Sequence, residues 1–478
     1  MRWPETASGN GKEGGRILAT HLSRRTVLTW AGAGLLAASG LRPRAAETAP
    51  DAPPNIIWIL ADDVGPNEIG CYGHPAIRTP HIDRLAREGL LFTNAFVTTS
   101  SCSPSRSSLF TGKYPHCTGA ENLHEPLPAE QAIVPELLKA RGYWTANVAK
   151  CHLGGPAQAK FDRLYRAIAD WETFFDERPK DQPFFLAVGF HDAHRPFDRG
   201  CVDPPYALDQ ITVPPYLPDT PEVREDLAGF YDEVTRMDET IGRLLARCEH
   251  EGLLQNTFVM FLGDNGPPFP RAKTTLYDSG IATPLVCFWP GRLPAGQRYD
   301  GLVSAVDIAP ATLEAAGLPV SGDMQGVSLW KQVGDPGQFG RRFIYAEKNW
   351  HDLDDHSRAV RDARFKYIRN AFYEKPLRPA ADVAGSPSFQ KMRELRDAGT
   401  LPPEVMLHFR NRRAPEELYD LACDAMEFHN VAAEPAYRPV LERMRAALEQ
   451  WIEETNDISP EDALPDKYDP ETGEKLPE

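Results

Sequence analysis

The sequence predicts an α/β fold, with a mainly parallel sheet that helices cover on both faces. Short apolar runs such as 55–61 and 257–262 are typical of strands buried on both sides. These runs alternate with segments of helical patterning, and strands that alternate with helices form parallel sheets. With 478 residues, 42% of them hydrophobic, the chain can bury one large core and a second, smaller one.

The first 49 residues have the pattern of a targeting leader. Arg24 and Arg25 precede an apolar run at 27–41 that is short for a membrane span. The pattern resembles a twin-arginine export signal with cleavage near Ala46, which predicts an exported, periplasmic protein without stable membrane insertion. The alternative is a chance Arg-Arg pair before a single anchor helix.

Residues 50–335 are expected to form the main, catalytic domain. The expected strands are 55–61, 144–149, 184–190, 257–262 and 284–288, and the expected helices are 79–89, 133–140 and about 222–250. The last of these repeats apolar residues at helical spacing, from Leu227 to Leu244, which predicts a stripe facing the core.

Residues 336–478 have a different pattern of expected strands and helices, and they are expected to form a smaller α+β subdomain. Strands at 343–347, 364–369 and 416–420 would form a small antiparallel sheet, segment 403–409 is ambiguous, and a closing helix spans about 436–454. The acidic, proline-rich tail after Asp457 is typical of a mobile segment.

Charge and cysteine usage exclude several classes of protein. The net charge is −16 and no extended basic tract follows the leader, which argues against nucleic-acid binding through a general positive field. A polyanionic substrate would have to be held by local basic residues. The eight cysteines are scattered without a Cys-x-x-Cys pair, so neither a zinc site nor a disulfide framework is predicted.

The segment 100–112 is the most informative stretch of the chain. Pro104 suits the first turn of a helix that ends at Gly112, and this puts Cys102 at the helix N-terminus, where an anion is favoured. Arg106, one turn further on, can reach the same anion with its planar fork of donors. The alternative is a buried structural cysteine beside a helix cap.

Four of the expected strands end in polar residues that can carry chemistry. In parallel sheets functional groups gather at these carboxyl ends. Three converging carboxylates would repel one another unless a cation lay among them, and oxygen ligands suit Ca²⁺ or Mg²⁺ rather than zinc. Each motif alone also fits a cap, a turn or a surface pair. The four ends carry Asp62 and Asp63, Lys150 to His152, His191 to His194, and Asp264 with Asn265.

Together these residues resemble the type I, formylglycine-dependent sulfatase family, whose signature is Cys-x-Pro-Ser-Arg followed by an apolar pair and Thr-Gly. Matching segments run from residue 55 to about 430. The resemblance implies the alkaline-phosphatase-superfamily fold, and oxidation of Cys102 to formylglycine by a formylglycine-generating enzyme. It also implies one calcium ion, held by Asp62, Asp63, Cys102, Asp264 and Asn265.

The same resemblance implies the catalytic roles. Arg106 and Lys150 would stabilise the hydrated aldehyde, one hydroxyl of which attacks sulfur. His194, with Lys273, would hold the sulfate and protonate the leaving group. His152 would then act as the base that lets the second hydroxyl expel sulfate.

Among sulfatases the chain is most similar to the heparan N-sulfatases, or sulfamidases, through segments 190–195, 214–221, 264–270 and 386–391. This implies N-sulfoglucosamine as the substrate. Lys273, where sulfamidases are expected to have arginine, and the short segment 154–181 depart from that pattern. Candidate contacts to the sugar, for which a solvated surface is the alternative, are His191, Arg195, His351, His356, Arg358 and Arg361.

Three other functions stay open from the sequence. The chain can be an O-sulfatase for another sulfated glycan or small ester, or a phosphate or phosphonate monoester hydrolase of the same superfamily. A non-catalytic, calcium-bound glycan-binding protein is the third, and the intact Cys102-to-Arg106 motif argues against it. The sequence leaves the oligomeric state undetermined.

Overall fold

The larger of two sheets in the structure, a computed structural model, has eight strands. They are β1 (Asn55–Ala61), β2 (Leu90–Phe96), β3 (Trp144–Ala149), β4 (Arg163–Tyr165), β5 (Phe184–Gly189), β6 (Thr257–Gly263), β7 (Ala282–Phe288) and β8 (Gln297–Ser304). Their order in the sheet is β4-β3-β5-β1-β6-β7-β2-β8. All neighbours run parallel except β7, which is antiparallel to both β6 and β2. The predicted mainly parallel sheet is confirmed.

The structure describes residues 52–458 and 464–477, so the predicted leader at 1–49 lies outside the described residues. Contacts join 51–478 into one compact unit. The proposed domain boundary near 335 falls between two short helices of that unit. Within the described ranges, no helix is both long enough and apolar enough to cross a membrane.

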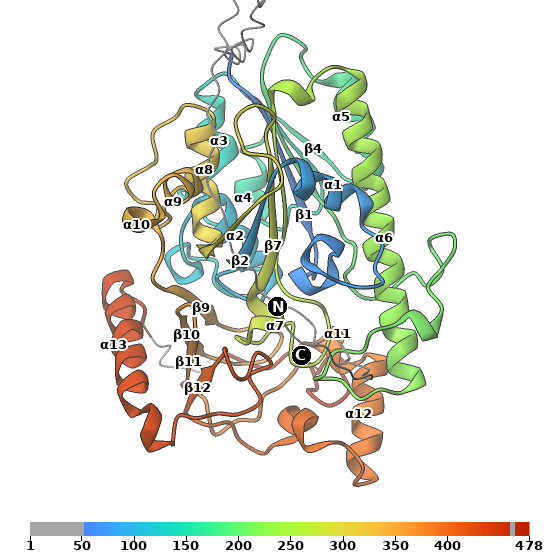
Figure 1. Ribbon diagram of the computed structural model, residues 1–478, viewed down its shortest axis with the longest axis vertical. Coiled ribbons are helices and arrows are strands. Elements are labelled where there is room, and N and C mark those ends of the chain that lie inside the picture. The colour runs from blue at the N-terminus through green and yellow to red at the C-terminus, as the bar shows by residue number, and fades with distance from the viewer. Residues whose placement is uncertain (1–51, 459–463, 478) are drawn as a thin grey trace, which may run out of the picture. The chain divides into compact units, whose positions relative to one another are not determined.

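Helices flank both faces of this sheet. The α-helices of the described residues are α1 (Pro80–Glu88), α2 (Cys102–Thr111), α3 (Val134–Lys139), α4 (Gly155–Gln158), α5 (Trp171–Glu177), α6 (Pro221–His250), α7 (Asp278–Ile281), α8 (Ile308–Ala315), α9 (Leu329–Gly334), α10 (Pro336–Phe339), α11 (Ala381–Ala384), α12 (Pro387–Asp397) and α13 (Arg438–Thr455). Because side chains alternate along a strand, β1 contributes to two cores. Ile57 and Ile59 share one core with α1, α5 and α6, whereas Trp58 and Leu60 share the other with α2, α3 and α8 (Figure 1).

The longest helix, α6, confirms the predicted amphipathic stripe. It starts at Pro221, whose fixed φ suits the first turn, and the Oγ1 of Thr220 caps it by accepting a hydrogen bond from the N–H of Val223 (3.4 Å). The residues from Leu227 to Leu244 at core-facing positions are buried. Each such large side chain contributes about 1.5–3 kcal/mol by leaving water, so this one helix anchors a whole face of the sheet.

The smaller sheet is antiparallel, as predicted, and α13 packs against it. Its strands are β9 (Ile344–Lys348), β10 (Ser357–Arg361), β11 (Phe365–Asn370) and β12 (Glu416–Asp420), in the order β12-β11-β10-β9. Met444, Leu448 and Trp451 of α13 form a third hydrophobic cluster with Val360 and Tyr367 of the sheet. The ambiguous segment at 403–409 is a 3-10 helix.

Two features differ from the sequence prediction. The prediction lacks β2, β4, β8 and β10; in β8 and β10, polar residues interrupt the apolar pattern, and the arginines of β10 are buried in ion pairs. The expectation of a mobile tail is wrong for 464–477, because the N–H of Lys467 donates to the Asp352 carbonyl (2.8 Å) and the tail folds back on itself between Tyr468 and Lys475.

Candidate active site

The four neighbouring strands β3, β5, β1 and β6 end at the same edge of the sheet because they run parallel. Asp62 and Asp63 follow β1, Lys150 follows β3, His194 follows β5 within five residues, and Asp264 follows β6. The motifs that the sequence analysis found at strand ends are therefore brought together by the topology, as expected for this kind of sheet.

A buried cluster of acidic residues surrounds the cysteine. One ligand atom from each of Asp62, Asp63, Cys102 and Asp264 lies within 4.8 Å of all the others, and all four residues are buried. The Cys102 Sγ is 3.7 Å from Asp63 Oδ1. Asp62 Oδ1 and Asn265 Oδ1 are buried without a hydrogen-bond partner. Hard oxygen atoms that lack protein partners fit a divalent cation such as calcium.

Two buried cations, Arg106 and Lys150, pair with these carboxylates. Arg106 donates from Nε to Asp264 Oδ2 (2.7 Å) and from Nη1 to the Lys150 carbonyl (2.8 Å), while Lys150 Nζ pairs with Asp62. Burial raises the pKa of Asp62 to about 6 against the opposing effect of Lys150. Burial acts the same way on Asp264, but Arg106 and Lys150 together lower the pKa of Asp264 to about 2. The difference arises because Asp264 accepts hydrogen bonds from both the Arg106 guanidinium and the N–H of Asp63, whereas the charged partner of Asp62 is Lys150 alone.

Helix α2 presents Cys102 from its first position, as predicted. The side chain of Ser101 does not cap the helix; its hydroxyl shares a hydrogen bond with Nδ1 of His351 (2.7 Å). Every residue of α2 is buried. Burial raises the pKa of the Cys102 thiol well above its ordinary value, so the unmodified side chain is a neutral thiol and a weak nucleophile.

His152 lies beside a histidine that the sequence analysis did not select. Its Nε2 shares a hydrogen bond with Nδ1 of His124 (2.8 Å), and its Nδ1 is buried without a partner. Burial, together with Lys150 and Arg106, lowers the pKa of His152 to about 2, so the ring is neutral near pH 7. Both histidines have positive φ, 63° and 66°, as does Asp63 at 57°, a concentration of strained backbone typical of functional sites.

Lys273 bridges two carboxylates, one of which belongs to the acidic cluster. Its Nζ donates to Asp63 Oδ2 (2.8 Å) and to Asp382 Oδ2 (2.7 Å), and Asp382 also lies 3.6 Å from Nε2 of His194. Burial opposes the charged form of Lys273, yet Asp382 and Asp63 raise its pKa well above the ordinary value, so the ammonium is retained. Asp382 comes from the C-terminal part of the chain and had no signal in the sequence.

The candidate sugar-binding residues differ in how far they are available to a substrate. The arginines already have partners: Arg195 forms a two-pronged pair with Asp226, Arg358 pairs with Asp457, and Arg361 pairs with Asp278. We therefore do not carry these arginines into the substrate site. Of the histidines, His191 is exposed and follows β5, whereas His356 is buried at the end of the segment before β10.

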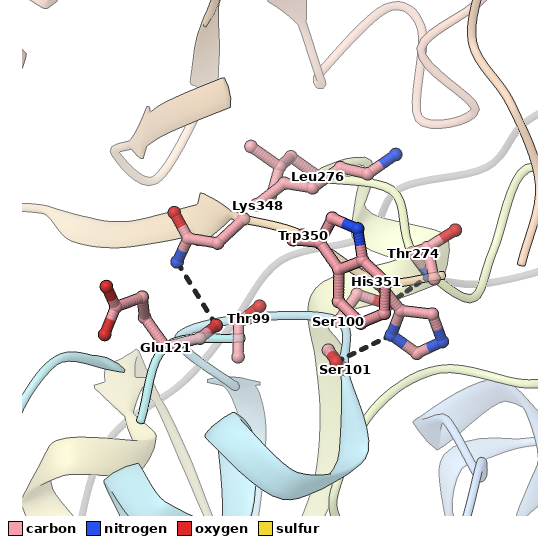
Figure 2. Close-up of a pocket in the computed structure, with 10 residues that line it drawn as sticks. Thr99, Ser100, Ser101, Glu121, Thr274, Leu276, Lys348, Trp350 and His351 are labelled. Carbon is pink, nitrogen blue, oxygen red and sulfur yellow. Dashed lines mark hydrogen bonds between the residues drawn. The ribbon is translucent and has the colours of Figure 1, made fainter. Parts of the chain in front are cut away.

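His351 is the candidate contact that the structure brings next to Cys102. Figure 2 shows its ring beside Ser101, in a small pocket that also has Thr274 and Trp350 in its wall. Burial lowers the pKa of His351 well below its ordinary value, so the ring is neutral. The segment after β9 thus contacts Ser101, the residue that precedes Cys102.

Family profiles and curated relatives match this chain. The sulfatase family profile matches residues 54–173 and 166–318, and the profile described as "N-sulphoglucosamine sulphohydrolase, C-terminal" matches 271–379. Human N-sulphoglucosamine sulphohydrolase is 32% identical over 477 residues, covering 88% of this chain and 94% of that protein. An ulvan-active sulfatase of Formosa agariphila is also 32% identical, over 84% of this chain and 74% of the relative.

Solved structures share the fold at lower identity. BT4656, solved with its substrate D-glucosamine-2-N,6-O-disulfate, has a TM-score of 0.67 at 20% identity and covers 86% of this chain and 99% of its own. The phosphonate monoester hydrolase of Agrobacterium radiobacter has the same TM-score at 19% identity, covering 84% and 96%. At such identities the likeness concerns the fold alone, which is that of the alkaline phosphatase superfamily. On the sequence profile and the two relatives, the chain belongs to the sulfatase family, whose members hydrolyse sulfate esters and sulfamates.

Proposed function

We propose that this sulfatase acts on sulfated glycans and removes the N-sulfate of terminal N-sulfoglucosamine, as in heparan sulfate, with Cys102 converted to formylglycine and one calcium ion bound. The observation that carries the proposal is the cysteine at the start of α2, enclosed by three carboxylates and buried cations. The choice of substrate rests on the 32% identity to human N-sulphoglucosamine sulphohydrolase over nearly the whole of that protein.

The calcium ligands in this proposal are the oxygens of Asp62, Asp63, Asp264 and Asn265, with the modified Cys102. Two of these oxygens, Asp62 Oδ1 and Asn265 Oδ1, have no protein partner. Burial, followed by the neighbouring carboxylates of Asp264 and Asp63, raises the pKa of Asp62, and a cation would offset both effects. When bound, calcium acts as a Lewis acid that offsets charge on the transferring sulfate group.

Cys102 as a thiol does not fit the role of nucleophile, because burial raises its pKa. As formylglycine it supplies a hydrated aldehyde, with one hydroxyl to attack sulfur and a second to release the sulfate. Arg106 and Lys150 would stabilise negative charge that develops on this residue, since both cations pair with carboxylates of the cluster around it. His152 is the proposed acceptor of the proton of the second hydroxyl, through its Nδ1, which is buried without a hydrogen-bond partner.

His194 is the proposed proton donor to the leaving nitrogen. Its Nδ1 donates to the Arg195 carbonyl (2.6 Å), which fixes the ring and leaves Nε2 directed at the carboxylates of Asp63 and Asp382. Lys273 Nζ, next to the same carboxylates, would bind a sulfate oxygen. The sulfamate nitrogen is a poor leaving group unless it is protonated, so a positioned acid matters more here than for an aryl ester.

Maturation and export complete the proposal. A formylglycine-generating enzyme would modify Cys102, and twin-arginine export would carry the folded protein to the periplasm. Changing Arg24→Lys and Arg25→Lys together is expected to retain the protein in the cytoplasm, as measured by cell fractionation. Unchanged export would refute the interpretation of the leader.

The second candidate is an O-sulfatase for another glycan, because the ulvan-active sulfatase is as identical to this chain as the human sulphohydrolase is. Released sulfate should be measured with N-sulfoglucosamine and with 6-O-sulfated N-acetylglucosamine, using the Cys102→Ala variant as the blank. Faster turnover of the N-sulfated sugar is expected. Faster turnover of the O-sulfated sugar would end the N-sulfatase assignment and favour the second candidate. Mass spectrometry of the Cys102 peptide tests the modification, and elemental analysis tests for one calcium per chain.

A further inference from the structure

Asp382 is the carboxylate of the site that faces its open side. Asp63 is fully buried and the Lys273 side chain is 2% exposed, whereas the Asp382 side chain is 22% exposed and that of its neighbour His194 is 32% exposed. Asp382 and His194 are therefore the groups of this cluster that a substrate entering from solvent meets.

Asp382 is separate from the four-residue cluster assigned to calcium. The ammonium of Lys273 lies between it and Asp63, with donor–acceptor distances of 2.7 and 2.8 Å. Since the lysine occupies this place, we leave Asp382 out of the set of carboxylates assigned to the ion.

The local backbone holds this carboxylate in one orientation. Asp382 Oδ1 accepts a hydrogen bond from the N–H of Val383 (2.9 Å), which leaves Oδ2 for the site. The N–H of Ala381 donates to Asp352 Oδ2 (3.1 Å). Gly473 of the C-terminal tail packs so closely on this turn that an added Cβ would lie 2.3 Å from the Ala381 carbonyl oxygen. The turn is thus supported from two sides, and the tail closes behind it.

We propose that Asp382 is the residue that selects N-sulfate over O-sulfate, by accepting a hydrogen bond from the N–H of the sulfamate. The inference rests on the proposed function. An ionised carboxylate only accepts hydrogen bonds, and the bridging nitrogen of a sulfamate carries a hydrogen. The bridging oxygen of a sulfate ester carries none and presents lone pairs, so the same carboxylate repels it.

The reacting nitrogen has to lie near His194, because that side chain is the proposed proton donor, and Asp382 Oδ2 is 3.6 Å from the His194 Nε2. As the S–N bond breaks and an S–O bond forms, the proton of His194 Nε2 passes to the nitrogen, and the product leaves as an amine. Asp382 exchanges no proton in this step. It holds the original N–H and remains beside the amine, whose ammonium form it attracts.

The test compares two substrates that differ in one atom, N-sulfoglucosamine and glucose 2-sulfate, on calcium-loaded enzyme with measured formylglycine content. In Asp382→Asn, kcat/KM for N-sulfoglucosamine is expected to fall about 10- to 100-fold, which is the effect of losing one hydrogen bond to a charged group. The rate with glucose 2-sulfate should stay the same or rise, because the asparagine amide can donate to the ester oxygen. Equal losses on both substrates would overturn the inference and reduce Asp382 to a support for Lys273.

Asp352→Asn is the matched control. It lies on the other side of the same turn, its φ of 61° is one that asparagine tolerates, and the amide oxygen can still accept from the Ala381 N–H. The ratio of the two rates should not change in this variant. A shift as large as that in Asp382→Asn would assign the effect to the turn as a whole and overturn the role of the Asp382 carboxylate.

A binding measurement on the wild type keeps the inference testable if a variant fails to fold. Glucosamine is expected to inhibit at least about tenfold more strongly than glucose, because only its ammonium meets Asp382. Equal inhibition by the two sugars would overturn the inference. A wild-type enzyme that prefers glucose 2-sulfate would instead overturn the proposed function, and the selection by Asp382 with it, before any variant is made.

Discussion

Replacing Asp264 by asparagine separates the two tasks of that residue, pairing with Arg106 and binding calcium. The carboxylate is fully buried; its Oδ2 accepts from Arg106 Nε (2.7 Å) and its Oδ1 from the N–H of Asp63 (3.1 Å). Asparagine has one oxygen, so one of these donors loses its acceptor and Arg106 loses its counter-charge. Breaking a buried pair costs about 3–5 kcal/mol, and relief of repulsion with Asp62 offsets a part. We expect a loss of about 3 kcal/mol in the free energy of unfolding, measured with urea in EDTA.

The calcium response of this variant gives the sharper test. Changes to partners outside the metal shell already weaken binding about 10- to 100-fold, so loss of a ligand should weaken calcium by about 100-fold or more. At a calcium concentration 100 times its Kd, the wild type gains about 2.7 kcal/mol of stability from the ion. The variant at the same concentration should gain less than about 0.5 kcal/mol.

Asp307→Asn is the control, because Asp307 is an equally buried partner of an arginine, Arg341 (Nε to Oδ2, 2.7 Å), outside the candidate metal cluster. It should lose comparable stability and keep the full gain from calcium. If Asp264→Asn gained as much stability from calcium as the wild type does, the assignment of this cluster to calcium would be refuted. Zinc found in the active enzyme by elemental analysis would refute it as well.

Three further predictions follow from the same contacts. Cys102→Ala should keep the wild-type unfolding midpoint and lower turnover to roughly a thousandth or less, since the residue supplies the nucleophile; a tenth of the wild-type rate would exclude that role. His124→Ala removes the ring that bonds His152 Nε2 (2.8 Å) and should lower kcat about tenfold at saturating substrate; an unchanged kcat would make the pair structural. Although burial opposes its charge, hydrogen bonds that the His116 ring donates to Cys117 and Glu347 raise the pKa of His116 to about 10. The stabilisation by the charged ring is therefore complete below about pH 6.5 and is lost as pH rises towards 10. Glu347→Gln should remove this part of the pH dependence in urea unfolding, and an unaltered slope would count against it.

Local chemistry decided much of the fold and the centre of the site. The apolar runs of β1 and β6 form strands because they suit a sheet buried on both faces, and each run stops at the acidic residues that follow it. Pro104 and Gly112 delimit α2 closely enough to place Cys102 at its first turn. Since parallel strands share one carboxyl edge, these motifs had to meet. That is why Asp62, Asp63 and Asp264 could be grouped before any coordinates were known.

Contacts between distant segments decided the rest, because nothing in a local pattern records the partner of a side chain. Asp382 and Lys273 are 109 residues apart, and His124 and His152 are 28 apart. Their meeting depends on how the C-terminal part and the loops close over the sheet. From its place in the sequence, Arg195 was a candidate substrate contact. In the fold, both its outer nitrogens donate to Asp226. The sequence by itself determined which residue types stand at the strand ends, and tertiary packing determined which charges remain available to a substrate, since a charge buried in a folded protein is stable only beside its counter-charge.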